Sequence, residues 1–222
     1  MSARDDVLAR IADAHRLAPS PDLPYDAVER AYRGAEVPGP DAGALVDLLV
    51  DRLLDYKALV RRTTPDGLAG TVAEALRERG ATSLVVPEGV DPAWLASSDV
   101  RVVADPGPAG PLTVDALDTA DGVLTGCALA VAATGTLVLD GTAGQGRRAV
   151  TLVPDYHLCV VRADQVVADV PQAVAGLEPT RPTTMISGPS ATSDIELNRV
   201  EGVHGPRTLE VVLVEDAGPD RG

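Results

Sequence analysis

Short runs of aliphatic residues recur along this chain, and Gly, Pro or charged residues bound most of them. The 222 residues include no Phe, and aromatic residues make up only 2%, so Val, Leu, Ile and Ala must build the core. Unbroken aliphatic runs of this length are typical of strands buried on both faces, as in parallel sheets. We predict strands at residues 83–87, 100–103, 122–125, 136–140, 149–154, 157–162, 183–187 and 208–214.

In the first half of the chain, segments with a helical pattern alternate with these predicted strands. Leu45, Leu48, Leu49 and Leu53 recur at the spacing of one helix face, and Gly80 is a suitable residue to cap a helix end. Helices that alternate with buried strands predict an α/β domain, in which a parallel or mixed sheet lies between helices. We predict helices at 3–17, 42–62, 66–79, 113–118 and 164–176.

A connector rich in Pro and Gly runs from Pro19 to Pro40. Such a composition is typical of an extended arm rather than of a packed core. We therefore divide the chain into an N-terminal helix with its connector at 1–40, an α/β domain at 41–215, and a flexible tail at 216–222.

The formal net charge is −14, and Lys57 is the single lysine of the sequence. Nucleic-acid binding depends on clustered Lys and Arg, so this charge disfavours a nucleic-acid partner. An anionic small molecule is still compatible with the sequence, because a pocket can carry Arg against the global charge.

Cys127 and Cys159 are the two cysteines. Two thiols cannot supply the four ligands of an iron–sulfur cluster or a structural zinc site, and their apolar neighbours are typical of buried thiols. The N-terminus lacks the apolar core of a signal peptide, and the uncharged stretch 122–139 contains Gly and Thr that favour strands over a membrane span. We predict a cytoplasmic protein that does not span a membrane.

The first loop with chemical potential is DGTAGQGRR at 140–148, which contains Gly144, Gly146, Arg147 and Arg148. Its glycines do not follow the dinucleotide-binding fingerprint, and a strand is predicted after it, so a Rossmann cofactor site is disfavoured. Backbone N–H groups of a glycine-rich loop can approach a ligand closely, and arginines bind carboxylate or phosphate at two points. A hairpin turn with two solvated arginines explains the same residues.

The second loop is SGPSATSDIE at 187–196, which follows a predicted strand. The predicted ligand-binding residues are Ser187, Gly188, Ser190 and Thr192, because hydroxyls and free N–H groups at a helix start attract anions. Asp194 and Glu196 are candidates for a base or nucleophile. The spacing of Ser193 and Glu196 equally fits a capping box, so spacing alone leaves both interpretations open.

The third loop is GVHGPR at 202–207, in which glycines flank His204. A loop histidine can titrate near neutral pH, so His204 is the predicted catalytic base. His157 lies at the mouth of a predicted strand, where a histidine with satisfied hydrogen bonds is the expected interpretation. Nothing in the spacing of the histidines and carboxylates predicts a metal site.

Five segments together resemble the lactate-utilisation protein C family, whose members are called LUD-domain proteins. The segments are ATGT (133–136), GQGRR (144–148), VPDYHLCVVRADQVV (153–167), SGPSATSDIE (187–196) and GVHGPRTLEVVLV (202–214). The resemblance implies a three-layer α/β/α fold with a mixed sheet, like that of sugar-phosphate isomerases and CoA-transferases.

The resemblance also implies a role in oxidising L-lactate to pyruvate, as one subunit working with iron–sulfur partner proteins. The chain itself is expected to bind no cofactor, which agrees with its two cysteines. Whether such a subunit is an enzyme is left open by the family pattern. The alternative is a stand-alone isomerase or acyl-transferase that binds a phosphate or CoA ligand, which rests on analogy of fold.

Overall fold

The computed structural model describes residues 3–17, 24–27, 41–190 and 205–215. The chain divides into two compact units, residues 1–34 and 35–222. The first unit contains α1 (Ala3–Leu17), which confirms the predicted helix, and a single 3-10 turn, η1 (Tyr25–Ala27). Every residue of α1 is exposed, including the apolar Val7, Leu8 and Ile11.

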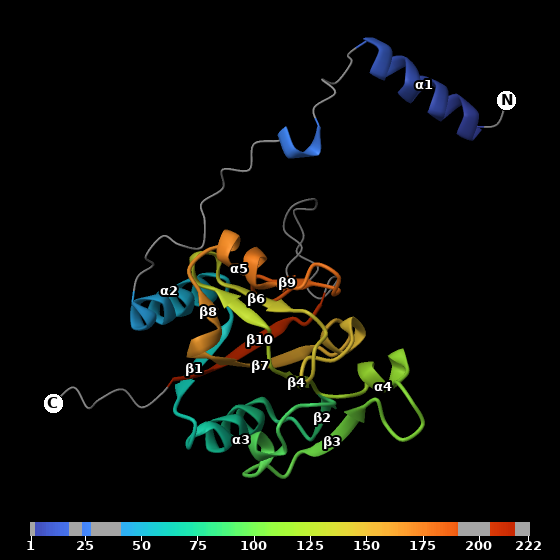
Figure 1. The fold of residues 1–222 in the computed structure, drawn as a ribbon. Helices are drawn as coiled ribbons and strands as arrows, with labels where there is room; N and C mark the ends of the chain where they lie inside the picture. The colour runs from blue at the N-terminus through green and yellow to red at the C-terminus, as the bar shows by residue number, and fades with distance from the viewer. Residues whose placement is uncertain (1–2, 18–23, 28–40, 191–204, 216–222) are drawn as a thin grey trace. The chain divides into compact units, whose positions relative to one another are not determined.

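A parallel sheet forms the centre of the second unit (Figure 1). Within the described residues it has six strands, and every neighbouring pair is parallel. Their order is β1 (Leu59–Thr63), β10 (Thr208–Val214), β7 (Tyr156–Arg162), β4 (Val123–Thr125), β2 (Ser83–Pro87) and β3 (Arg101–Asp105). The register places His157 of β7 between Leu209 of β10 and Val123 of β4.

A second, smaller sheet packs beside the first. Its four described strands, in order, are β8 (Val166–Val167), β5 (Leu129–Val131), β6 (Thr136–Leu139) and β9 (Thr184–Ile186). The β5–β6 and β6–β9 pairs are antiparallel, whereas β5 and β8 are parallel. The predicted α/β class is confirmed, and the mixed strand directions belong to this second sheet rather than to the central one.

Alternate residues of the central strands face two different layers. On β10, Val211 and Leu213 pack with α2 (Ala42–Asp55) and the second sheet, while Val212 and Val214 pack with α3 (Leu68–Arg79). α4 (Val114–Asp118) lies on the same face as α2, and α5 (Val170–Gly176) covers the outer face of the second sheet. Both faces of the central strands are therefore buried, as their aliphatic sequences predict.

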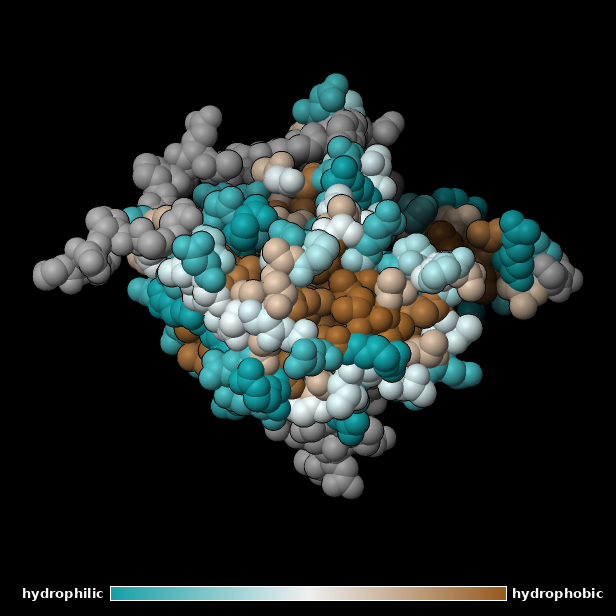
Figure 2. Space-filling model, turned by 90° about the horizontal axis from the view of Figure 1, so that it is seen from below, coloured by the Kyte–Doolittle hydropathy of each residue, from teal (hydrophilic) through white to brown (hydrophobic). Residues whose placement is uncertain are grey.

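The face that carries α3, β2 and β3 is seen in Figure 2. Apolar residues gather in the middle of this face, and hydrophilic residues surround them. Among the described helices, none is long and apolar enough to cross a membrane. The uncharged stretch 122–139 instead forms β4, β5, the 3-10 turn η3 (Ala132–Thr134) and β6.

Two predicted helix boundaries and one predicted strand were wrong. The helix predicted at 42–62 ends at Asp55, because Lys57 adopts a left-handed φ of 69°, and the chain then continues as β1. The strand predicted at 149–154 is a 3-10 turn, η4 (Arg148–Thr151), whose buried Val150 packs near α4. The helix predicted at 164–176 begins only at Val170, after the turn η5 (Ala163–Gln165) and β8, since Asp169 caps it.

Candidate functional site

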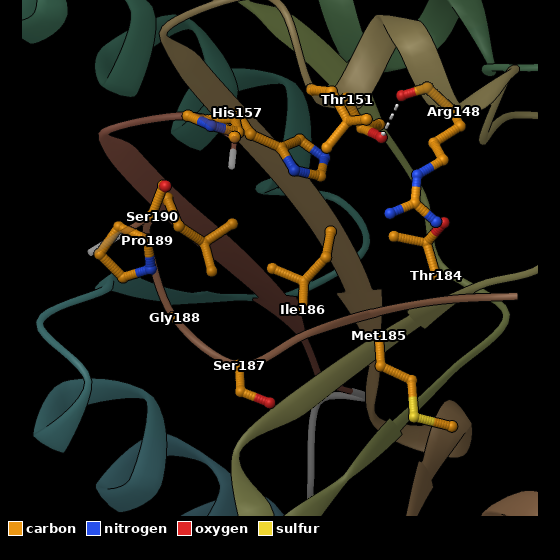
Figure 3. A pocket seen from close by; sticks show the side chains of 14 residues that line it. Arg148, Thr151, His157, Thr184, Met185, Ile186, Ser187, Gly188, Pro189 and Ser190 are labelled. Carbon is orange, nitrogen blue, oxygen red and sulfur yellow. Dashed lines mark hydrogen bonds between the residues drawn. The ribbon is translucent and has the colours of Figure 1, made fainter. Parts of the chain in front are cut away.

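A cavity of about 220 Å³ lies between the two sheets, at the amino ends of β7 and β10 (Figure 3). The central sheet contributes His157 and Leu209 to its wall, and the turn η4 contributes Arg148 and Thr151. β9 and the segment after it, residues 184–190, form the opposite wall, and residues 205–206 complete the described lining. Residues of the loops 140–148 and 187–196 therefore meet at one cavity. Gly205 and Pro206 of the third loop, 202–207, also line it.

The cavity has an unusual charge for this protein. Arg148 is the only Lys or Arg among its described lining residues, and none of those residues is Asp or Glu. The guanidinium of Arg148 makes no hydrogen bond or ion pair with the residues that the structure describes. In a chain of net charge −14, the described lining thus carries one positive charge and no acidic residue.

His157 is buried in the cavity wall and is only 1% exposed. Its Nε2 lies 2.7 Å from the hydroxyl oxygen of Thr125. Its Nδ1 has no hydrogen-bond partner among the described residues. Within the described residues, the strand register thus provides a partner for one of the two ring nitrogens, so the expected hydrogen bonding is seen at Nε2 alone. A buried polar atom without a partner is rare in folded proteins and calls for a physical reason.

A hydrogen-bonded chain of polar groups leads from His157 into the core. The hydroxyl of Thr125 donates to Cys159 Sγ over 3.8 Å, and Cys159 Sγ lies 3.7 Å from the carbonyl oxygen of Gly126. The hydrogen bond between the two thiols raises the pKa of Cys127 and lowers that of Cys159, while burial acts to raise both. These opposite shifts make Cys127 the donor and Cys159 the acceptor of the hydrogen bond between the thiols.

Residues 187–190 follow β9 and hold the cavity's second wall. Ser187 Oγ lies 2.8 Å from Thr136 Oγ1, so this predicted ligand-binding hydroxyl is bonded to β6. Gly188 has a φ of 85°, and a side chain there would come within 2.6 Å of Tyr56 Cβ. The N–H of Ser190 donates to the carbonyl of Pro206 over 2.8 Å, which ties this wall to the segment before β10.

The glycine loop places its two arginines in different environments. Arg147 turns away from the cavity and donates to Asp105 at two points and to the carbonyl of Leu112. Gly146 packs against Pro87 and Val150, where a side chain would come within 2.9 Å. The N–H of Gly144 donates to the carbonyl of Glu88, so these glycines hold the loop against β2. Arg147 and Gly146 line a separate hollow of about 510 Å³.

Four sequence-predicted site residues, Thr192, Asp194, Glu196 and His204, lie outside the described residues. Of the others, Arg148, Ser187, Gly188 and Ser190 line the cavity together. Sequence reasoning did not select His157 or Thr184 as site residues. A polar residue within the aliphatic run of β7 was the available signal for His157. No group of three or more His, Cys, Asp or Glu that could hold a metal occurs in the described part of the chain.

Comparison with known proteins assigns the chain to a family. A crystal structure of a DUF162 family protein from Deinococcus radiodurans has the same fold, with a TM-score of 0.66 and 40% identity, and the alignment covers 79% of this chain and 99% of that one. Residues 112–214 match the LUD domain. A protein of Deinococcus radiodurans named lactate utilization protein C is 46% identical over 183 residues, or 80% of this chain and 84% of the relative. This chain belongs to the LUD-domain family.

The LUD relatives extend beyond one genus. The lactate utilization protein C of Geobacillus kaustophilus is 31% identical over 175 residues, which is 69% of this chain and 71% of the relative. All described residues that line the cavity lie inside the LUD match at 112–214. The cavity therefore belongs to the part of the chain that defines the family.

Proposed function

We propose that this protein works in lactate utilisation and that its cavity binds the carboxylate of a small hydroxy or oxo acid. The names of the relatives support the pathway. The observation that carries the ligand class is the unpaired guanidinium of Arg148 in a cavity whose described lining contains no acidic residue. Arginine binds a carboxylate through two parallel N–H donors, which gives both affinity and orientation.

The size of the cavity favours a ligand of a few heavy atoms. Its volume of about 220 Å³ lies below the range of roughly 300–1,000 Å³ that is usual for larger metabolites and drug-sized ligands. Apolar side chains of Ile186, Leu152 and Leu209 share the lining with Arg148. One charged group beside a short apolar wall matches a three-carbon acid better than a CoA ester or a sugar phosphate.

We further propose that the electrons of lactate oxidation pass to iron–sulfur partner proteins in the cytoplasm. Oxidising a hydroxy acid to an oxo acid releases two electrons and two protons, which need an acceptor. The buried Cys127 and Cys159 cannot supply the four thiolates of a cluster, so a redox centre of that kind belongs on a partner. In this proposal the LUD protein is the subunit that holds the acid.

Isothermal titration of the full chain with L-lactate, pyruvate and the uncharged analogue lactamide tests the ligand class. Both acids should bind, and lactamide should bind at least about tenfold more weakly. Arg148→Gln should weaken the binding of both acids by a similar factor. Arg101→Gln is the matched control, because Arg101 is exposed on β3 and lies outside the cavity lining. Unchanged acid binding by Arg148→Gln would remove the cavity from the proposal.

A reconstitution experiment tests the role in the pathway. Lactate oxidation by the cluster-bearing partners is measured with the wild-type chain, with Arg148→Gln and without this chain. The proposal expects loss of activity without the chain and reduced activity with the variant. Full activity in its absence would contradict it, and tighter binding of sugar phosphates or CoA esters than of lactate would favour the isomerase or acyl-transferase alternative.

A further inference from the structure

We propose that His157 Nδ1 accepts a hydrogen bond from the hydroxyl of a 2-hydroxy acid, and that this contact makes the cavity select 2-hydroxy acids over 2-oxo acids. The inference rests on the proposed function, since it deepens the account of the same cavity. It starts from an imidazole that is 1% exposed, lines the cavity and has one nitrogen without a partner in the described structure.

The position of the imidazole proton follows from the groups behind it. Thr125 lies between His157 Nε2 and Cys159 Sγ, and its hydroxyl donates to the sulfur. A hydroxyl has one proton, so when it donates to the sulfur its oxygen accepts at the contact of 2.7 Å, and Nε2 is the donor there. The lowered pKa of Cys159 agrees with this direction, because hydrogen bonds donated to the sulfur, including the one from Thr125, stabilise its charged form.

With the proton on Nε2, neutral His157 presents a lone pair at Nδ1. An N–H on Nδ1 would be a buried donor without an acceptor among the described residues, which is costly. A ligand hydroxyl that donates to Nδ1 satisfies the atom without adding charge. A ligand group that donates to Nδ1 therefore strengthens binding, and a ligand group that can only accept a hydrogen bond there weakens binding.

The cavity brings this acceptor to the same side as the cation. In Figure 3 the imidazole of His157 and the side chain of Arg148 border one opening, with Thr151 between them and Ile186 across from them. A 2-hydroxy acid carries its hydroxyl on the carbon next to its carboxylate, so both groups can meet this wall at once. A 2-oxo acid offers only a carbonyl oxygen there, which faces the Nδ1 lone pair.

Titration of the wild-type full chain tests the inference without any substitution. L-Lactate donates a hydroxyl hydrogen bond, whereas 2-methoxypropionate, propionate and pyruvate keep the carboxylate and lack that donor. We expect L-lactate to bind about fivefold to tenfold more tightly than each of the other three, the effect of one hydrogen bond that leaves its partner unsatisfied when lost. Equal binding of all four acids would overturn the inference and leave the carboxylate site intact. Absence of binding by all four would overturn the proposed function as well.

Two substitutions of His157 separate its two nitrogens. In His157→Asn the amide can place an oxygen near the position of Nδ1, and in His157→Gln it can reach Thr125 at the position of Nε2 while leaving the Nδ1 position empty. We expect His157→Asn to keep the preference for L-lactate over propionate. His157→Gln should reduce that preference to within about twofold, because the Nδ1 position then offers no acceptor to the ligand hydroxyl. A preserved preference in His157→Gln would contradict the assigned contact.

Nitrogen-15 NMR of the histidine rings gives an independent measurement on the unliganded full chain. The sequence has three histidines, so the ring signals can be assigned by substituting His15 and His204. The expected spectrum of His157 is that of a neutral ring protonated at Nε2, whose Nδ1 signal shifts when L-lactate binds but not when propionate binds. A proton on Nδ1 in the unliganded chain would overturn the inference.

Discussion

Arg147 and Asp105 form a two-point ion pair, with Nε 3.0 Å from Oδ2 and Nη2 3.2 Å from Oδ1. The carboxylate of Asp105 is 3% exposed and also accepts from the N–H of Leu112. The guanidinium of the neighbouring Arg148 instead borders the cavity and has no partner among the described residues. Adjacent arginines of one motif thus lie in different environments, and in the proposed function only Arg148 binds the ligand.

We expect Arg147→Met to lower the free energy of unfolding by about 2–3 kcal/mol, because it leaves a buried carboxylate without its cation. Arg148→Met should change it by less than about 0.5 kcal/mol and should instead weaken acid binding. Urea denaturation of both variants makes the comparison. Adding Asp105→Asn to Arg147→Met should recover part of the loss, and an equal loss in both arginine variants would contradict this division.

The sequence predicted most of the fold and only part of the site, and the glycine loop shows why. The aliphatic runs of β2, β7 and β10 are local signals, because burial on both faces is encoded in the residues themselves. The different environments of Arg147 and Arg148 depend on Asp105, which lies at the end of β3 and is distant in sequence. No local pattern contains that information.

His157 illustrates the same limit within one strand. Its neighbours in YHLCVVR predict a buried strand correctly. The partner of Nε2 is Thr125 of β4, and β9 and η4 supply other parts of the wall of the cavity that His157 lines. Which nitrogen is satisfied is therefore decided by strand register and by the second sheet. Similarly, the left-handed backbone at Lys57 ends α2 although the residue type does not favour that conformation.

Gly188 should be required for the wall of the cavity. Its φ is 85°, and an added Cβ would meet Tyr56 Cβ at 2.6 Å. Gly80 is the matched control, because its φ is 70° and an added Cβ would meet no atom within 4 Å. We expect Gly80→Ala to cost about 1 kcal/mol for backbone strain alone. Gly188→Ala should cost at least about 1 kcal/mol more and weaken lactate binding. Equal costs in urea denaturation would show that the contact with Tyr56 relaxes freely.

Thr125 should control ligand choice although it does not line the cavity. Thr125→Val removes the acceptor that holds the proton on His157 Nε2, so both tautomers become available and the preference for L-lactate over propionate should fall to about twofold or less. Thr125→Ser keeps the hydroxyl and should keep the preference. Isothermal titration measures both variants with both acids. Equal affinity of Thr125→Val and wild type for propionate is the control that the carboxylate site is intact.

The carboxylate of Asp121, which lies in a loop, should make the free energy of unfolding depend on pH in the acidic range. Its Oδ2 accepts four hydrogen bonds from the backbone N–H groups and hydroxyls of Thr82 and Ser83, which lower its pKa from an ordinary value near 3.8 to about 2. A lowered folded-state pKa means that the stabilisation is complete above about pH 4 and is lost as the pH falls towards 2. The shift corresponds to about 2.4 kcal/mol, which solvent screening at this exposed carboxylate reduces to about 1 kcal/mol. Asp121→Asn should therefore be less stable than wild type by about that amount at neutral pH, and the difference should shrink in acid.

Asp66→Asn is the control for this prediction. Asp66 is exposed and has no described hydrogen bond, so this variant should differ from wild type by less than about 0.5 kcal/mol. Urea denaturation across this pH range measures the difference, and a gap that widens in acid would contradict the assignment.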